Sequence, residues 1–80
     1  MKPTVGRIVH YVLPASYLRP GDIRPAIIVR VWPANRCNIR IFLDGPNDQS
    51  DGLDEAEWVG TVNYSEEPAP GTWHWPSRED

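Results

Sequence analysis

The stretch CNIRIFL at residues 37–43 decides the fold class, because apolar side chains occupy every second position in it. Successive side chains of a β-strand point to opposite faces, so this alternation predicts a half-buried strand. The residues predicted to face a core are Cys37, Ile39, Ile41 and Leu43. The residues predicted to face outward are Asn38, Arg40 and Phe42.

Other segments of the chain are equally short and rich in Val, Ile, Tyr and Trp, which is typical of strands. They are residues 5–13, 24–32, 58–64 and 72–75. Nine prolines and six glycines lie along the chain, and no segment has helical periodicity. Pro25 has no N–H for a ladder, so its end of the strand should lie at an edge or just outside the pairing. Residues 1–80 are therefore predicted to form a single all-β domain, a small SH3-like or OB-like partly open barrel of about five short strands.

The strand at residues 24–32 is also predicted to have two distinct faces. Its predicted core-facing residues are Ile27, Val29 and Val31, and its predicted outward residues are Ile28, Arg30 and Trp32. With the outward residues of the 37–43 strand, this arrangement places arginines beside large apolar side chains. We therefore expect a surface rich in guanidinium groups and rings.

The length and the single cysteine limit how this chain is stabilised and where it works. Cys37 is the only cysteine in 80 residues, so neither an internal disulfide nor a Cys-rich zinc site is expected. We expect Cys37 to be a small core residue and a homo-oligomer to add the burial that one small domain lacks. No membrane-spanning segment or signal peptide is recognised, which predicts a cytoplasmic protein.

The net charge of −3 hides an asymmetry between the two halves of the chain. Nearly all basic residues lie in residues 1–40, whereas nearly all acids lie in residues 41–80, and every basic residue except Lys2 is arginine. An acidic chain is a poor partner for duplex nucleic acid or an anionic membrane. The arginine guanidinium binds phosphate or carboxylate through two parallel hydrogen bonds and also stacks on aromatic rings. These arginines either bind an anionic partner or pair with the acids of the second half.

No pattern of residues indicates catalysis, a cofactor or a metal site. The GxSxG, HExxH, Walker and dinucleotide-binding motifs are absent. Cys37 with His10 or His74 could form a nucleophile–base pair, but nothing near them in the sequence supports one. The acidic run DGPNDQSDGLDE at residues 44–55 lacks the spacing of an EF-hand and is predicted to be a solvated loop. We expect a protein that is not an enzyme.

Four tryptophans and three tyrosines are a heavy aromatic content for a chain with a single phenylalanine. Trp73 and Trp75 would share one face of a strand, with His74 on the other. A small barrel holds at least two of the tryptophans in its core but cannot bury all four. At least one should line a pocket or a subunit interface, where Trp and Tyr are enriched.

Three stretches resemble a widespread group of small uncharacterised bacteriophage proteins. They are GRIVHYV at residues 6–12, RPAII at residues 24–28 and PGTWHWP at residues 70–76. The resemblance covers both ends of the chain and one middle strand. It implies a phage source, and hence the cytoplasm of the host cell, but almost no mechanism.

The leading hypothesis is a phage-encoded, non-enzymatic protein that sequesters a small anionic nucleotide-type ligand, such as a host immune signalling molecule, between protomers. Such an anti-defence sponge needs arginines for phosphates, rings for bases, and Asp or Asn for ribose or base edges. The predicted ligand-binding residues are Tyr11, Arg24, Arg30, Trp32, Arg40, Phe42, Asp44, Asn47, Trp73 and Trp75.

Other functions stay open at this point. The chain could be a protein–protein inhibitor or adaptor that acts on a host protein through an exposed aromatic face and the acidic 44–57 loop. It could also bind single-stranded nucleic acid as OB folds do, although the acidic half argues against this. An enzyme has the weakest support.

Overall fold

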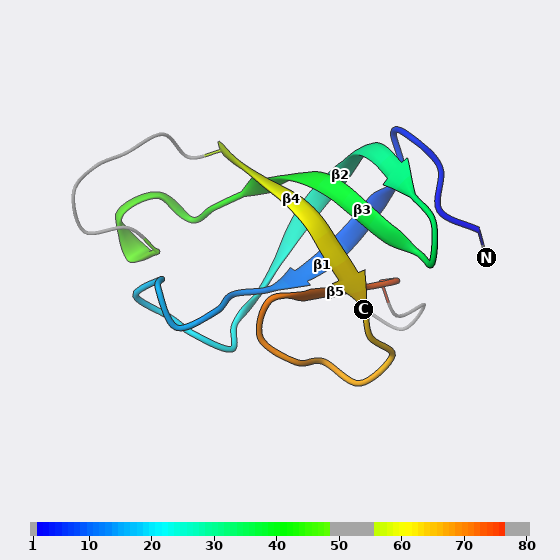
Figure 1. Ribbon diagram of the computed structural model, residues 1–80. Coiled ribbons are helices and arrows are strands. Elements are labelled where there is room, and N and C mark those ends of the chain that lie inside the picture. The colour runs from blue at the N-terminus through cyan, green and yellow to red at the C-terminus, as the bar shows by residue number, and fades with distance from the viewer. Residues whose placement is uncertain (1, 49–55, 77–80) are drawn as a thin grey trace.

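The computed structural model describes residues 2–48 and 56–76, which form a ring of five strands (Figure 1). The strands are β1 (Ile8–Val12), β2 (Ile23–Trp32), β3 (Arg36–Phe42), β4 (Ala56–Tyr64) and β5 (Thr72–His74), with one 3-10 turn, η1 (Gly45–Asn47). They pair in chain order into a closed barrel. The prediction of a small all-β barrel is confirmed. The ring is closed rather than partly open, and its consecutive order differs from the Greek-key order of an OB fold.

The short strand β5 closes the ring, and this removes the free sheet edges that would otherwise invite aggregation. It pairs in parallel with β4 and antiparallel with β1, and Figure 1 shows it beside β1. In the antiparallel register Trp73 lies opposite Tyr11, and His74 lies opposite His10. Across the described residues, no helix is long and apolar enough to cross a membrane.

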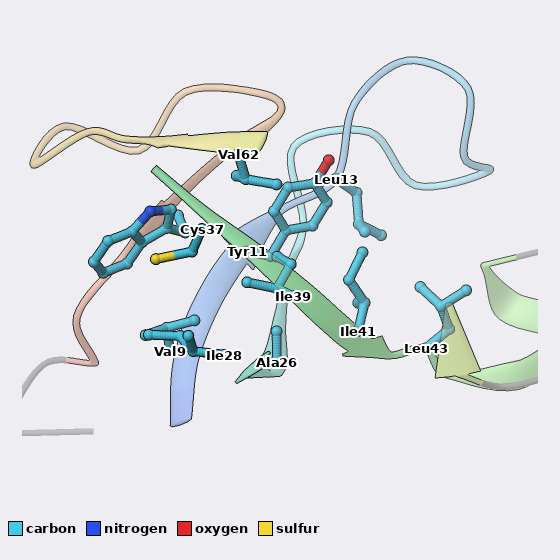
Figure 2. Packing of buried hydrophobic residues seen from close by; sticks show 11 residues of the cluster. Val9, Tyr11, Leu13, Ala26, Ile28, Cys37, Ile39, Ile41, Leu43 and Val62 are labelled. Atoms are coloured by element: carbon cyan, nitrogen blue, oxygen red, sulfur yellow. The ribbon is translucent and has the colours of Figure 1, made fainter. Parts of the chain in front are cut away.

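The interior of the barrel is filled by side chains from all five strands and from their flanks (Figure 2). The fully or almost fully buried members are Val9, Tyr11, Leu13, Ala26, Ile28, Cys37, Ile39, Ile41, Leu43, Val62 and Trp73. Each large apolar side chain removed from water contributes about 1.5–3 kcal/mol. The predicted core face of residues 37–43 is confirmed, as is the placement of Cys37 in the core.

The faces predicted for β2 are wrong for its aliphatic residues and right for Arg30 and Trp32. Ile28 is fully buried instead of outward, whereas Val29 and Val31, predicted to face the core, are 41% and 38% exposed. The reason is a β-bulge between Ile28 and Arg30. A bulge adds one residue to one strand and so shifts the alternation of its side chains. Ala26 and Ile28 therefore point inward before the bulge, and Arg30 still points outward after it. Ile27, predicted to face the core, lies opposite the exposed Arg40.

Two backbone features explain the ends of β1 and β2. Gly6, at φ +93°, donates its N–H to the Ile28 carbonyl at 2.8 Å, and Ile28 donates to the Arg7 carbonyl at 3.0 Å. This is a glycine bulge, which only glycine adopts without strain, so the regular strand begins at Ile8 and not before the glycine. Pro25 pairs with His10 of β1 but lies just beyond the ladder between β2 and β3, which begins at Ala26.

An ion pair with a buried carboxylate fastens the start of β2 to the end of η1 at one end of the barrel, where Figure 1 shows η1 near the loop after β1. The Arg24 guanidinium donates from Nε and Nη2 to the two carboxylate oxygens of Asp48, both at 2.7 Å. Asp48 also accepts from the Asp44 N–H at 2.7 Å, and its carbonyl accepts from the Leu18 N–H at 3.0 Å. The hydrogen bonds from Arg24 hold the pKa of Asp48 below its usual range despite burial. Arg24 therefore pairs with an acid of the second half of the chain, which is one of the two alternatives that the sequence left open for the arginines.

Candidate functional site

Three of the aromatic side chains predicted to bind a ligand help to form the core. Tyr11 is buried, and burial raises the pKa of its hydroxyl. Trp73 is fully buried, and its indole N–H donates to the Asn35 carbonyl at 3.0 Å. The half-buried Trp75 packs edge-on against Trp73 with ring centres 5.2 Å apart. A ligand at the surface cannot reach Tyr11 or Trp73 without opening the barrel, so we leave these three out of the candidate site.

Three of the predicted polar residues are engaged in loop structure. Arg24 is held by Asp48, as described above. The Asn47 side-chain amide donates to the Asp44 carboxylate at 2.9 Å, across the η1 turn. This contact is the kind by which Asn and Asp stabilise turns. These residues support the loop end of the barrel and are not gathered with the arginines of the sheet.

The remaining predicted residues lie on the outer surface of β2 and β3. They are Arg30, Trp32, Arg40 and Phe42. Arg40 and Phe42 alternate with the buried residues of β3 and are exposed, and Arg30 is exposed on β2. The structure therefore brings together four of the predicted residues on one side of the sheet.

The register extends this surface across two more strands. Directly opposed residues share a face of the sheet. Arg40 lies opposite Ile27 of β2 and opposite Trp58 of β4, and Ile27 lies opposite Ile8 of β1. We call this surface the basic aromatic face and define it as Ile8, Ile27, Arg30, Trp32, Asn38, Arg40, Phe42 and Trp58.

Trp58 is the aromatic member of this face that sequence reasoning missed as a site residue. It is 58% exposed, the most exposed ring of the described residues. Its indole lies over Gly60, because a Cβ on Gly60 would come within 2.7 Å of Trp58 Cη2. Residues i and i+2 of a strand share a face, so the glycine provides room for the ring to lie against the sheet. The signal in the sequence was a Trp two positions before a Gly within a strand.

Arg30 and Trp32 form a stacked pair at the other end of the face. The Arg30 Cζ lies 4.2 Å from the centre of the Trp32 ring, which is the geometry of a cation–π contact. The indole N–H of Trp32 donates to Asn38 Oδ1 at 2.9 Å. The half-buried Trp32 is therefore fixed from one side by Asn38 and covered on a ring face by Arg30.

Carboxylates are absent from the basic aromatic face. The one acid in the described strands, Glu57, lies opposite the inward Ile41 and accepts a hydrogen bond from the Tyr17 hydroxyl. Burial, followed by this bond to Glu57, raises the pKa of Tyr17. Among the residues that the structure describes, Arg24 alone forms ion pairs. Within residues 2–48 and 56–76, Arg30 and Arg40 have no carboxylate partner.

The other chemistries considered from the sequence find little support in the geometry. Burial raises the pKa of the Cys37 thiol, whereas a nucleophilic cysteine needs a lowered one. Within residues 2–48 and 56–76, no three His, Cys, Asp or Glu side chains gather closely enough to hold a metal ion. Residues 49–55, half of the acidic 44–57 loop, lie outside the described residues.

Comparisons with protein-family models, with curated proteins and with solved structures found no match to this chain.

Proposed function

We propose that this chain is a non-enzymatic binding protein that captures a small anionic nucleotide-type ligand on its basic aromatic face. The observation that carries the proposal is the pairing of Trp58 and Arg40, an exposed indole directly opposite a guanidinium that has no acidic partner among the described residues. A ring for the base and a fork for the phosphate are the two groups that such a ligand requires.

The energetics of this pair suit a nucleotide. Stacking a base on an aromatic side chain contributes about 1–3 kcal/mol, and a hydrogen bond to a charged group contributes about 1.5–3 kcal/mol. Neighbouring strands are about 4.7–4.9 Å apart, so a base stacked on Trp58 has its sugar and phosphate within reach of Arg40. None of the acids that the structure describes lies on the face, so none of these repels the phosphate.

Sequestration follows from the same surface if a second copy of the chain covers the ligand. An open face contacts only one side of a bound nucleotide, and a second protomer would contact the other side. We therefore propose that the chain binds its ligand as a homo-oligomer. The resemblance to phage proteins extends it to a role in the host cell, where removal of an immune signalling nucleotide would serve the phage.

The test is a thermal-shift and calorimetric screen of cyclic and linear nucleotides against the intact chain. A ligand at 100 times its Kd stabilises the native state by about 2.7 kcal/mol, which raises the melting temperature measurably. Arg40→Gln and Trp58→Ala should each reduce the affinity at least tenfold, whereas Arg19→Gln, an exposed arginine outside the face, should not. The proposal fails if no nucleotide shifts the melting temperature at millimolar concentration, or if Arg40→Gln binds as tightly as the wild type.

A second candidate function, inhibition of a host protein, is favoured by the aliphatic part of the exposed surface. Ile8 and Val29 are 49% and 41% exposed, and they extend the apolar area beyond what one nucleotide would cover. Protein interfaces bury about 800 Å² per partner and have apolar centres. Val29→Lys, at an exposed valine outside the basic aromatic face, should abolish binding of the protein partner and leave nucleotide binding intact. Loss of both, or of neither, would contradict this second function.

A further inference from the structure

Asn38 lies between two irregularities of the barrel, one in each neighbouring strand. The register with β2 shifts between Ile28 and Arg30, and the register with β4 shifts between the partners of Cys37 and Ile39. On β4 the extra residue falls at residues 60–61, where Thr61 has φ +54°. A left-handed backbone costs a β-branched residue about 1–3 kcal/mol. Thr61 must therefore be held in place by other contacts.

The side chain of Asn38 supplies such a contact. Its Oδ1 accepts from the Thr61 N–H at 2.8 Å and from the Trp32 indole N–H at 2.9 Å. Because both partners are donors, they determine which end of the amide is the oxygen. Asn38 thus couples the bulge of β4 to the orientation of an indole on β2.

The orientation of the indole in turn places Arg30. A guanidinium stacked over a ring keeps its N–H groups in the plane parallel to the ring, where they are available to an acceptor. Arg24 and Arg36 use their N–H groups on Asp48 and on the Pro33 carbonyl. The Arg30 side chain donates no hydrogen bond within the part of the chain that the structure describes. Among those residues, its guanidinium contacts the Trp32 ring and has no acceptor for its N–H groups.

We infer that Arg30 is a preordered phosphate-binding fork, positioned by Trp32 and Asn38, and that it binds a second phosphate of the ligand. This inference rests on the proposed function, because it assigns the first phosphate and the base to Arg40 and Trp58. Arg30 lies opposite Asn38, two residues from Arg40 along β3 and two strands from Trp58. With strand spacing of about 4.8 Å and a rise of about 3.4 Å per residue, Arg30 lies about 12 Å from Trp58 and about 8 Å from Arg40. The ligand class we assign is therefore a nucleoside diphosphate or a dinucleotide, in which the base lies on Trp58 and successive phosphates reach Arg40 and then Arg30.

Preordering makes the fork effective. Fixing a flexible side chain on binding costs about 0.5–1.5 kcal/mol, and stacking on Trp32 removes most of that cost in advance. Asn38 and Trp32 act in this scheme as positioning residues, since only Arg30 touches the phosphate.

The first experiment measures the order of the arginine side chains by NMR relaxation of their Nε–Hε groups, with no ligand present. We expect Arg30 to be rigid and the exposed Arg7 to be mobile, with order parameters near 0.85 and below 0.6 as found for rigid and flexible groups. Trp32→Leu and Asn38→Ala should both make Arg30 as mobile as Arg7. A mobile Arg30 in the wild type overturns the preordering whatever the ligand screen shows.

The second experiment compares the binding of ADP, AMP and pyrophosphate to the wild type and to Arg30→Gln. Arg30→Gln should weaken ADP binding about ten- to a hundredfold and leave AMP binding unchanged, because AMP has no second phosphate. Equal losses for ADP and AMP overturn the assignment of the second phosphate to Arg30, while the proposed function stands. Pyrophosphate that shifts the Arg30 Nε–Hε signal when neither nucleotide binds supports the fork and contradicts the proposed function. No effect of any probe on Arg30 overturns the fork.

Discussion

Arg24→Met should destabilise the barrel by about 3–5 kcal/mol at neutral pH, because it leaves a buried carboxylate without its cation. The Asp48 side chain has no exposed surface, and it loses both 2.7 Å hydrogen bonds to Arg24 while its bond from the Asp44 N–H remains. Methionine keeps the apolar stem, so the measured loss reports mainly on the charge. This is a large part of the roughly 5–15 kcal/mol that stabilises a typical folded domain.

The size of this loss should depend on pH in a definite direction. In the wild type the hydrogen bonds from Arg24 lower the pKa of Asp48 from an ordinary value of 3.8. A carboxyl with a lowered folded-state pKa contributes stability above its unfolded-state pKa, and that contribution is lost as the pH falls through the folded-state value. In Arg24→Met, burial without the cation raises the pKa of Asp48 instead. The difference between the two proteins should therefore be greatest near pH 7 and shrink as the pH falls, first through the raised pKa of Asp48 in the variant and then through its lowered pKa in the wild type.

Urea unfolding followed by tryptophan fluorescence at pH 7 and at pH 3 measures both quantities, since the core contains Trp73. Arg7→Met is the matched control, because Arg7 is exposed and its side chain has no partner among the described residues. The control should change the free energy of unfolding by less than about 0.5 kcal/mol. A loss under about 1 kcal/mol for Arg24→Met, typical of a surface pair, or a loss independent of pH would refute the reasoning.

Three further outcomes are expected. Gly60→Ala should displace the indole of Trp58 and lower nucleotide affinity, while the free energy of unfolding changes by no more than about 1 kcal/mol; unchanged affinity in the titration would refute the platform role of that ring. The thiol of Cys37 should react with a thiol reagent only when the protein unfolds, because it is buried with a raised pKa; labelling of the native protein at the rate of a free thiol would contradict this. Trp73→Phe should cost about 2–3 kcal/mol in urea unfolding, through a cavity and the unsatisfied carbonyl of Asn35, and a loss below about 0.5 kcal/mol would argue against the buried position.

Local alternation determined much of the fold. The side chains of β3 alternate regularly between the barrel interior and its outer surface. The period of two was therefore sufficient to assign Cys37, Ile39 and Ile41 to the core. Proline and glycine ended the strands close to where the structure ends them. The pattern of apolar residues determined the all-β class, because no segment has the periodicity that a helix requires.

The candidate site was predictable in part, because the same alternation of side chains along a strand also identifies the outward residues. The outward alternation of β3 placed Arg40 and Phe42 correctly. Arg30 and Trp32 were also placed on the outside, although the assumption of a regular β2 strand wrongly placed Ile28 with them. The bulge between Ile28 and Arg30 could not be read from β2 alone.

Which arginines and tryptophans are available at the surface was decided only by the tertiary structure. The chain contains four tryptophans of the same intrinsic character, yet Trp73 is buried because β5 closes the ring and Trp58 is exposed because its side chain lies on the outer face of β4. Arg24 meets Asp48 through a loop, whereas Arg40 meets none of the described acids. Alternation is a property of neighbours along the chain, and the sequence determines it directly. Closure, bulges and ion pairs join residues far apart in sequence, so they exist only once the strands have paired.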